Sequence, residues 1–146
     1  MINSRFLIFI SLISSTTFSN ELCEDAYFDA ESNFDEAIES TNNASDSYTE
    51  ATLLETTSPP EDKWNICTEY KYAKDYAIEA DASFDIVISY YKQAIQVCRG
   101  KNIANAKKNL QLTKEDKQYN FDLFNNINQA MNDIKCKFDS YGDFQE

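Results

Sequence analysis

The sequence predicts an all-α protein: an antiparallel, up-down bundle of three long helices held together by two disulfides. Three observations predict it. Only two glycines and two prolines occur in 146 residues, which argues against a turn-rich β fold. Apolar residues recur at alternating steps of three and four, the spacing of helices that pack side by side. The four cysteines fall near the expected helix ends, where they could staple neighbouring helices together.

The first predicted helix carries the clearest apolar stripe. Large residues and alanines alternate along it, and each series repeats every seven residues, as in helices that pack knobs into holes. The helix should end between Leu54 and Thr57, because Ser58-Pro59-Pro60-Glu61 resembles the N-cap, N1 proline and N3 glutamate of a following helix. The stripe consists of Cys23, Tyr27, Ala30, Phe34, Ala37, Thr41, Ala44, Tyr48 and Ala51.

The second predicted helix should be the central one, because its apolar arc is wide enough to contact two neighbours. Its stripe runs from Cys67 to Cys98, and four isoleucines widen it. Arg99 followed by Gly100 is typical of a helix C-terminus. The third predicted helix begins at Asn102 and ends at Gly142. An N-cap pattern begins at Thr113, so this segment is either one kinked helix or a short helix followed by a long one.

Residues 1–19 have the composition of a secretory signal peptide. Arg5 precedes the apolar stretch Phe6 to Ile13, and Thr17-Phe18-Ser19 is a small-x-small cleavage site. The apolar stretch is too short to span a bilayer; an uncleaved membrane anchor is the alternative. We therefore expect a signal peptide at 1–19, one helical domain at 20–142 and a tail at 143–146, in a protein that is periplasmic or secreted.

If the protein is exported to an oxidising compartment, its four cysteines predict two disulfides. Cys67 and Cys98 cannot pair if one straight helix holds both, since they would lie roughly 46 Å apart at the helical rise. An antiparallel bundle instead brings Cys23 to Cys98 and Cys67 to Cys136. A structural zinc site is disfavoured, because the chain has no histidine and no Cys-x-x-Cys pair.

Charge is strongly segregated along the chain. The stretch from Glu21 to Asp62 holds thirteen acids and no base, whereas the stretch from Lys63 to Glu146 holds twelve acids and twelve bases. Nucleic acid and an anionic membrane are poor partners for such a surface, whereas a basic protein would suit it. The alternative is that the charge only keeps an exported protein soluble. The predicted partner-binding residues are Glu24, Asp29, Glu31, Asp35, Glu36 and Glu39.

The sequence offers no recognisable catalytic set. Without histidine the commonest general base and metal ligand are missing, and two glycines cannot build a phosphate-binding loop. Clustered carboxylates could bind calcium or act as an acid and base pair, but here they share a helix surface rather than a loop or cleft. We expect no catalytic residue, no metal and no cofactor, and we predict a non-enzymatic binding protein of the inhibitor, immunity or adaptor type.

The aromatic residues suggest an alternative function. Nine tyrosines exceed what the core stripes need, and tyrosine is favoured at interfaces and pockets. The chain could therefore be a small-ligand carrier whose pocket is lined by Trp64, Tyr72, Tyr76 and Tyr90. Alternatively, the same side chains face the third helix in a wide core.

Overall fold

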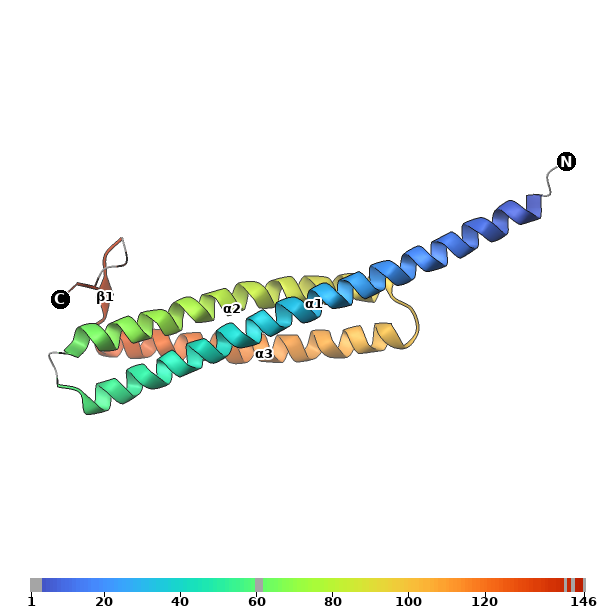
Figure 1. The fold of residues 1–146 in the computed structure, drawn as a ribbon. Helices are drawn as coiled ribbons and strands as arrows, with labels where there is room; N and C mark the ends of the chain where they lie inside the picture. The colour runs from blue at the N-terminus through green and yellow to red at the C-terminus, as the bar shows by residue number, and fades with distance from the viewer. Residues whose placement is uncertain (1–3, 60–61, 141, 143, 146) are drawn as a thin grey trace.

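The protein folds into three long helices followed by a small hairpin (Figure 1). The structure is a computed structural model that describes residues 4–59, 62–140, 142 and 144–145, with side chains described from residue 20 onward. The helices are α1 (Ser4–Thr57), α2 (Lys63–Val97) and α3 (Lys101–Asp133), and the antiparallel hairpin pairs β1 (Lys137–Phe138) with β2 (Phe144–Gln145). The predicted all-α up-down bundle is therefore confirmed, with the hairpin as an addition.

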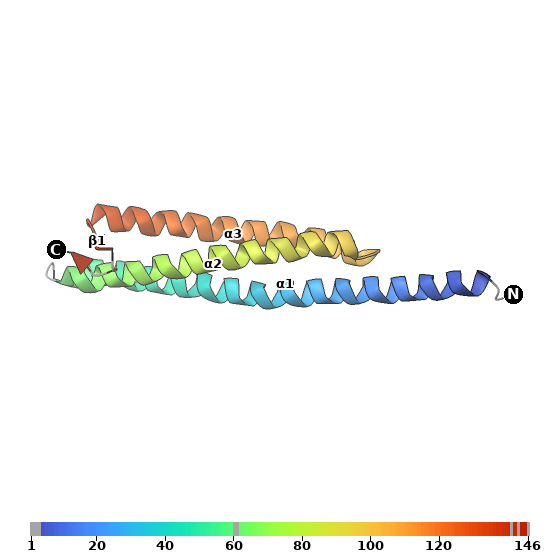
Figure 2. The same ribbon diagram turned by 90° about the horizontal axis from the view of Figure 1, so that it is seen from above.

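Helix α2 is the centre of the bundle, as predicted. It packs against both α1 and α3, and Figure 2 shows it lying between them. Residues 4–19 of the predicted signal segment and the first bundle helix form one continuous helix, whose first turns extend past the end of the bundle (Figure 1). Among the described residues, no helix is long and apolar enough to cross a membrane.

Buried alanines let α1 and α2 approach closely, and aromatic rings fill the space between them. Ala30, Ala37, Ala44 and Ala51 of the predicted stripe are completely buried. The three aromatic residues of the same stripe meet aromatic partners on α2 in a single antiparallel register, which agrees with their spacing at multiples of seven residues. The ring pairs are Tyr27 with Tyr91, Phe34 with Phe84 and Tyr48 with Tyr70, with centroids 6.0, 6.3 and 5.8 Å apart.

Both predicted disulfides are present. Cys23 pairs with Cys98 across 4.9 Å between Cα atoms, and Cys67 pairs with Cys136 across 5.5 Å. The first joins α1 to the end of α2, and the second joins the start of α2 to the residues just after α3. No cysteine in the described part of the chain is free.

The start of α2 differs from the prediction. The backbone N–H of Ser58 donates to the Leu54 carbonyl at 2.8 Å, so Ser58 continues the end of α1 instead of capping α2. Asp62 takes the N-cap position, without a side-chain hydrogen bond, and α2 begins at Lys63. Two further members of the predicted capping box, Pro60 and Glu61, lie outside the described residues.

Helix α3 runs without interruption through Thr113, so of the two alternatives that the sequence left open, the structure has a single helix. Thr113 is buried, and its hydroxyl donates to the Asn109 carbonyl one turn earlier at 2.9 Å. Threonine can satisfy its hydroxyl in this way inside a helix as well as at an N-cap. Its cap-like sequence signal is therefore not decisive.

The glycines predicted to end α2 and α3 also differ from the prediction. Gly100 has φ +57°, but it lies two residues past Cys98, the C-cap of α2, and takes the N-cap position of α3; the last turn of α2 holds no basic residue. Gly142 does not end α3, because it lies in the hairpin connection with φ +85°. The helix ends at Asp133, and Lys135 adopts φ +58° in a Schellman motif whose two bonds run from Cys136 N to Met131 O and from Lys135 N to Asn132 O. Cys136 thus lies outside the helix.

Candidate functional site

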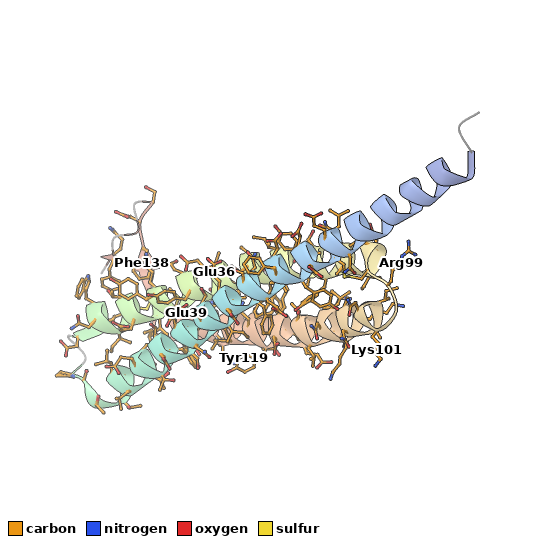
Figure 3. The ribbon with its side chains drawn as sticks, turned by 45° about the vertical axis from the view of Figure 1, so that its right-hand side comes forward. Glu36, Glu39, Arg99, Lys101, Tyr119 and Phe138 are labelled. Atoms are coloured by element: carbon orange, nitrogen blue, oxygen red, sulfur yellow. A yellow bond between two sulfur atoms is a disulfide. The ribbon has the colours of Figure 1, made fainter. Side chains whose placement is uncertain are left out.

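The acidic residues of α1 face solvent. Of the six predicted partner-binding residues, all are exposed except Asp29, which is half-buried. Glu36 and Glu39 lie along the outer side of α1, midway along the bundle (Figure 3). The stripe that packs on α2 accounts for this exposure, because the residues between its members must point outward.

These acids have no cationic partner within the described chain. None of the six forms an ion pair with another described residue; the described ion pairs join Lys71 to Asp75 at 3.0 Å and Lys117 to both Asp81 and Asp85 at 3.1 and 2.6 Å. The negative charge of α1 is therefore not neutralised by the bundle itself, and it is available to a partner.

The six acids do not converge on one point. With about 100° between successive helical residues, Glu24, Glu31 and Asp35 fall on one flank of the exposed face. Asp29 and Glu36 fall on the opposite flank, and Glu39 lies between. We call this surface the acidic face of α1; it spans about 160° of the helix circumference. A partner that contacts all six must wrap around the helix or use two surfaces.

One flank of the acidic face borders a groove between α1 and α3. Glu24 and Glu31 line a hollow of about 330 Å³, and Glu31 also lines the next hollow, of about 230 Å³. The shared glutamate makes the two hollows neighbours, and we call them together the α1–α3 groove. Its other walls are Cys23, Tyr27, Phe28, Phe34, Tyr91, Asn102, Asn105, Asn109, Leu112 and Thr113.

Two tyrosines fix the walls of the α1–α3 groove. The Tyr27 hydroxyl donates to the Asn102 carbonyl at 2.6 Å, and the Asn109 side-chain amide donates to the Tyr91 hydroxyl at 3.4 Å. Burial, together with the charge of nearby Glu31, raises the pKa of both tyrosines. They remain neutral near pH 7, so the negative charge of the groove comes from its carboxylates.

Phe28 is a candidate site residue that was not predicted from the sequence. Its side chain is 73% exposed in the middle of the acidic face, and Glu24 and Glu31 lie on the neighbouring turns. The available signal was a large apolar residue placed off the packing stripe of an otherwise polar helix face. An exposed ring among carboxylates suits a partner that offers apolar and basic groups together.

The aromatic residues proposed as a pocket lie along the outside of α2. Trp64, Tyr72 and Tyr76 are exposed, and Tyr90 packs partly against the cluster around Val87. Trp64 and Tyr90 are about 39 Å apart at the helical rise. The four side chains therefore do not converge on one cavity.

Nothing in the described part of the chain assembles a metal site, since no three potential ligands among Cys, Asp and Glu gather there. Comparison with protein-family models, with curated proteins and with solved structures finds no match for this chain. The function proposed below therefore depends on sequence and geometry.

Proposed function

We propose that the chain is an exported, non-catalytic binding protein that captures a basic protein partner on the acidic face of α1, in the manner of an inhibitor, immunity or adaptor protein. The observation that supports it is the stretch from Glu21 to Asp62, which holds thirteen acidic residues and no basic one. The six predicted partner-binding residues in this stretch form no ion pair with another described residue. Charge of one sign on one surface accelerates encounter with a partner of the opposite sign.

Export is supported by two features. The two disulfides indicate an oxidising, extracytoplasmic environment, and residues 1–19 have the composition of a cleavable signal. Cleavage after Ser19 would leave a single helical domain, 20–142, with a short tail, 143–146, as a periplasmic or secreted protein.

The contacts available on α1 favour a partner with both charged and apolar groups. An exposed ion pair contributes only about 0.2–1 kcal/mol, so the carboxylates alone would give weak, salt-sensitive binding. Phe28 offers an apolar anchor at the centre of the face, and such buried aromatic anchors supply much of the binding free energy in interfaces. The α1–α3 groove beside Phe28 can receive lysine or arginine side chains next to Glu24 and Glu31.

The proposal is tested by affinity capture with the oxidised protein as bait, from envelope and culture extracts of the source organism, at low and then high salt. We expect a stoichiometric basic protein that is released as the salt concentration rises. The variant Asp29→Asn/Glu36→Gln/Glu39→Gln should bind that protein at least about tenfold more weakly, because three unpaired charges facing the partner are lost.

A matched control neutralises three acids elsewhere, in the variant Glu79→Gln/Asp122→Asn/Asp133→Asn. It changes the net charge equally but leaves α1 intact, so it should retain binding. Circular dichroism should show the same helix content in both variants. Equal loss of binding in the two variants, or binding that does not change with salt, would contradict a site on α1.

A further inference from the structure

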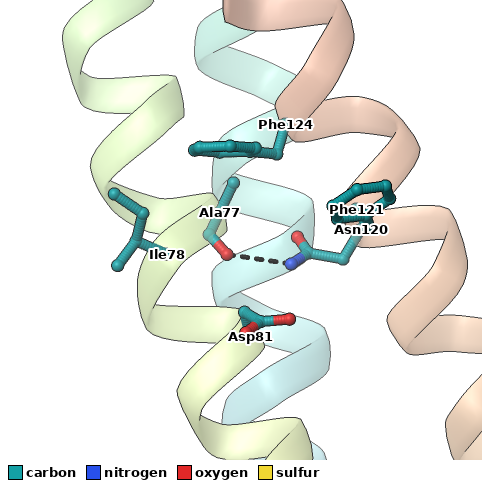
Figure 4. A pocket seen from close by; sticks show the side chains of 6 residues that line it. All are labelled: Ala77, Ile78, Asp81, Asn120, Phe121 and Phe124. Carbon is teal, nitrogen blue, oxygen red and sulfur yellow. Dashed lines mark hydrogen bonds between the residues drawn. The ribbon is translucent and has the colours of Figure 1, made fainter.

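A second, smaller cavity opens between α2 and α3, away from the acidic face. Its volume is about 210 Å³. One turn of α2 contributes Ala77, Ile78 and Asp81, and α3 contributes Asn120, Phe121 and Phe124 (Figure 4). Most of the lining is apolar, and Ile78 and Phe121 at the mouth are each about half exposed. The cavity therefore presents two aromatic rings and an aliphatic side chain to whatever enters it.

Asn120 gives this apolar cavity one polar group of fixed orientation. The side chain is only 1% exposed, and its Nδ2 donates to the Ala77 carbonyl at 2.8 Å (Figure 4). A carbonyl can only accept, so this bond decides which end of the amide is nitrogen. The Oδ1 atom is buried, points toward the space between the lining side chains (Figure 4) and has no hydrogen-bond partner among the described residues.

An unpaired buried acceptor is unfavourable, so a molecule that donates a hydrogen bond to Oδ1 would be stabilised there. The charges around the cavity argue for a neutral molecule. The Asp81 carboxylate would repel an anion, and Lys117, which pairs with Asp81 at 3.1 Å, and Lys74, whose Nζ lies 5.8 Å from the Phe124 ring centroid, would repel a cation.

We propose that this cavity is a binding site for a small neutral aromatic molecule carrying one N–H or O–H donor, with the ring between Phe121, Phe124 and Ile78 and the donor on Asn120 Oδ1. The volume admits one ring or two fused rings, since cavities of about 150 Å³ already bind benzene. The site is independent of the proposed function, because it uses no residue of α1.

The test is titration of the oxidised, full-length protein with indole and with benzofuran, which has the same bicyclic shape but no N–H donor. Calorimetry should give indole an affinity at least about tenfold higher than benzofuran, the effect of one buried hydrogen bond. Amide chemical shifts in a ¹⁵N NMR spectrum should change around Ala77, Phe121 and Phe124 and remain unchanged around Glu36.

The variant Asn120→Leu isolates the hydrogen bond, because leucine has a similar size and no acceptor. It should bind the two probes with equal affinity. If this variant does not fold, the comparison of the two probes on the unmodified protein still decides the proposal. Three results would each overturn the proposal: no saturable binding up to the solubility of indole, equal affinities of the unmodified protein for both probes, or chemical-shift changes confined to other surfaces. Asn120 would then serve only to fix the register of α2 and α3.

Discussion

At the scale of single residues, Tyr70 shows how a buried polar group is satisfied in this bundle. It is 1% exposed and packs its ring on Tyr48, while its hydroxyl donates to Glu55 Oε2 at 2.8 Å. Burial, reinforced by the Glu55 carboxylate, raises the pKa of Tyr70 to about 12. The side chain thus joins the stripe of α2 to the last turns of α1 and stays protonated well above neutral pH.

This shift predicts a pH dependence of stability. In the unfolded chain tyrosine ionises near pH 10, whereas folded Tyr70 keeps its proton until about pH 12. The unfolded state therefore binds fewer protons between these values, so the stability that protonated Tyr70 contributes is intact below pH 10 and is lost as pH rises toward 12. Urea unfolding should show a free energy of unfolding that falls between about pH 10 and about pH 12, and less steeply in Tyr70→Phe.

The matched control is Tyr119→Phe, because Tyr119 is 59% exposed on α3. The free energy of unfolding of this variant should fall with pH as it does in the unmodified protein. Tyr70→Phe should also lower stability below pH 10 by about 1 kcal/mol, the net value of one hydrogen bond. An unchanged alkaline slope in Tyr70→Phe would show that other groups, such as Tyr27 and Tyr91, account for the whole effect.

At the scale of elements, just after the end of α3 lies a lysine in the left-handed backbone conformation, which residues other than glycine disfavour. Lys135 has φ +58°, in the left-handed region, and the Schellman bonds of Cys136 and Lys135 close the helix around it. A side chain with a Cβ atom costs about 1–2 kcal/mol there, and glycine does not. The disulfide between Cys136 and Cys67 holds the chain in this path.

Lys135→Gly should therefore stabilise the protein, by about 1 kcal/mol or slightly less because glycine gains entropy in the unfolded chain. Thermal and urea unfolding of the oxidised protein measure the change. The control Lys137→Gly removes the same charge two residues later, in β1, where glycine should destabilise the strand. Equal effects of the two substitutions would mean that lost charge, rather than backbone conformation, is responsible.

The elements that could be predicted are those whose signals are local. The heptad stripe of α1 and the longer stripe of α2 each repeat many times, so the helices, their pairing and the disulfide partners follow from the sequence. The outward-facing acids were predictable for the same reason. Helix ends were predicted less well, because Lys135 at the end of α3 carries none of the usual signals and Thr113 carries a misleading one.

The parts of the candidate sites that escaped prediction depend on neighbouring elements. Asn120 reads as an ordinary polar residue of α3, and only the nearby Ala77 carbonyl orients its oxygen into a cavity. Phe28 lies off the stripe, but its exposure could be recognised only from the structure, in which no other helix covers it. The predicted tyrosine pocket failed to form because its members are spread along α2 instead of meeting across two helices.

At the scale of the whole molecule, the charge of α1 and the two disulfides have opposite effects on the stability of the bundle. The net charge of −12 belongs to α1 and its flanks, because the remainder of the chain is balanced. Repulsion along this acidic helix opposes its folding. The two disulfides, which close loops with sequence separations of 75 and 69 residues, offset such repulsion by restricting the unfolded chain.

Because the two loops are of similar size, chain entropy predicts that removing either disulfide costs about 4 kcal/mol. Cys23→Ala/Cys98→Ala and Cys67→Ala/Cys136→Ala should thus lower the free energy of unfolding by similar amounts. The loops overlap along the chain, so after one disulfide is removed the other still restricts part of the same segment of the unfolded chain. Removing both should therefore cost more than twice the loss of one.

The two disulfides should differ in what they hold locally. The hairpin of β1 and β2 follows directly on Cys136, contacts α2 through β2 and packs Phe138 on Phe144 with ring centroids 5.9 Å apart. A two-stranded hairpin is marginal in water by itself, so it should open when Cys67→Ala/Cys136→Ala releases its anchor. Hydrogen exchange should show lost protection at Phe138 and Phe144 in that variant and retained protection in Cys23→Ala/Cys98→Ala; protection that survives in both would mean that packing on α2 alone holds the hairpin.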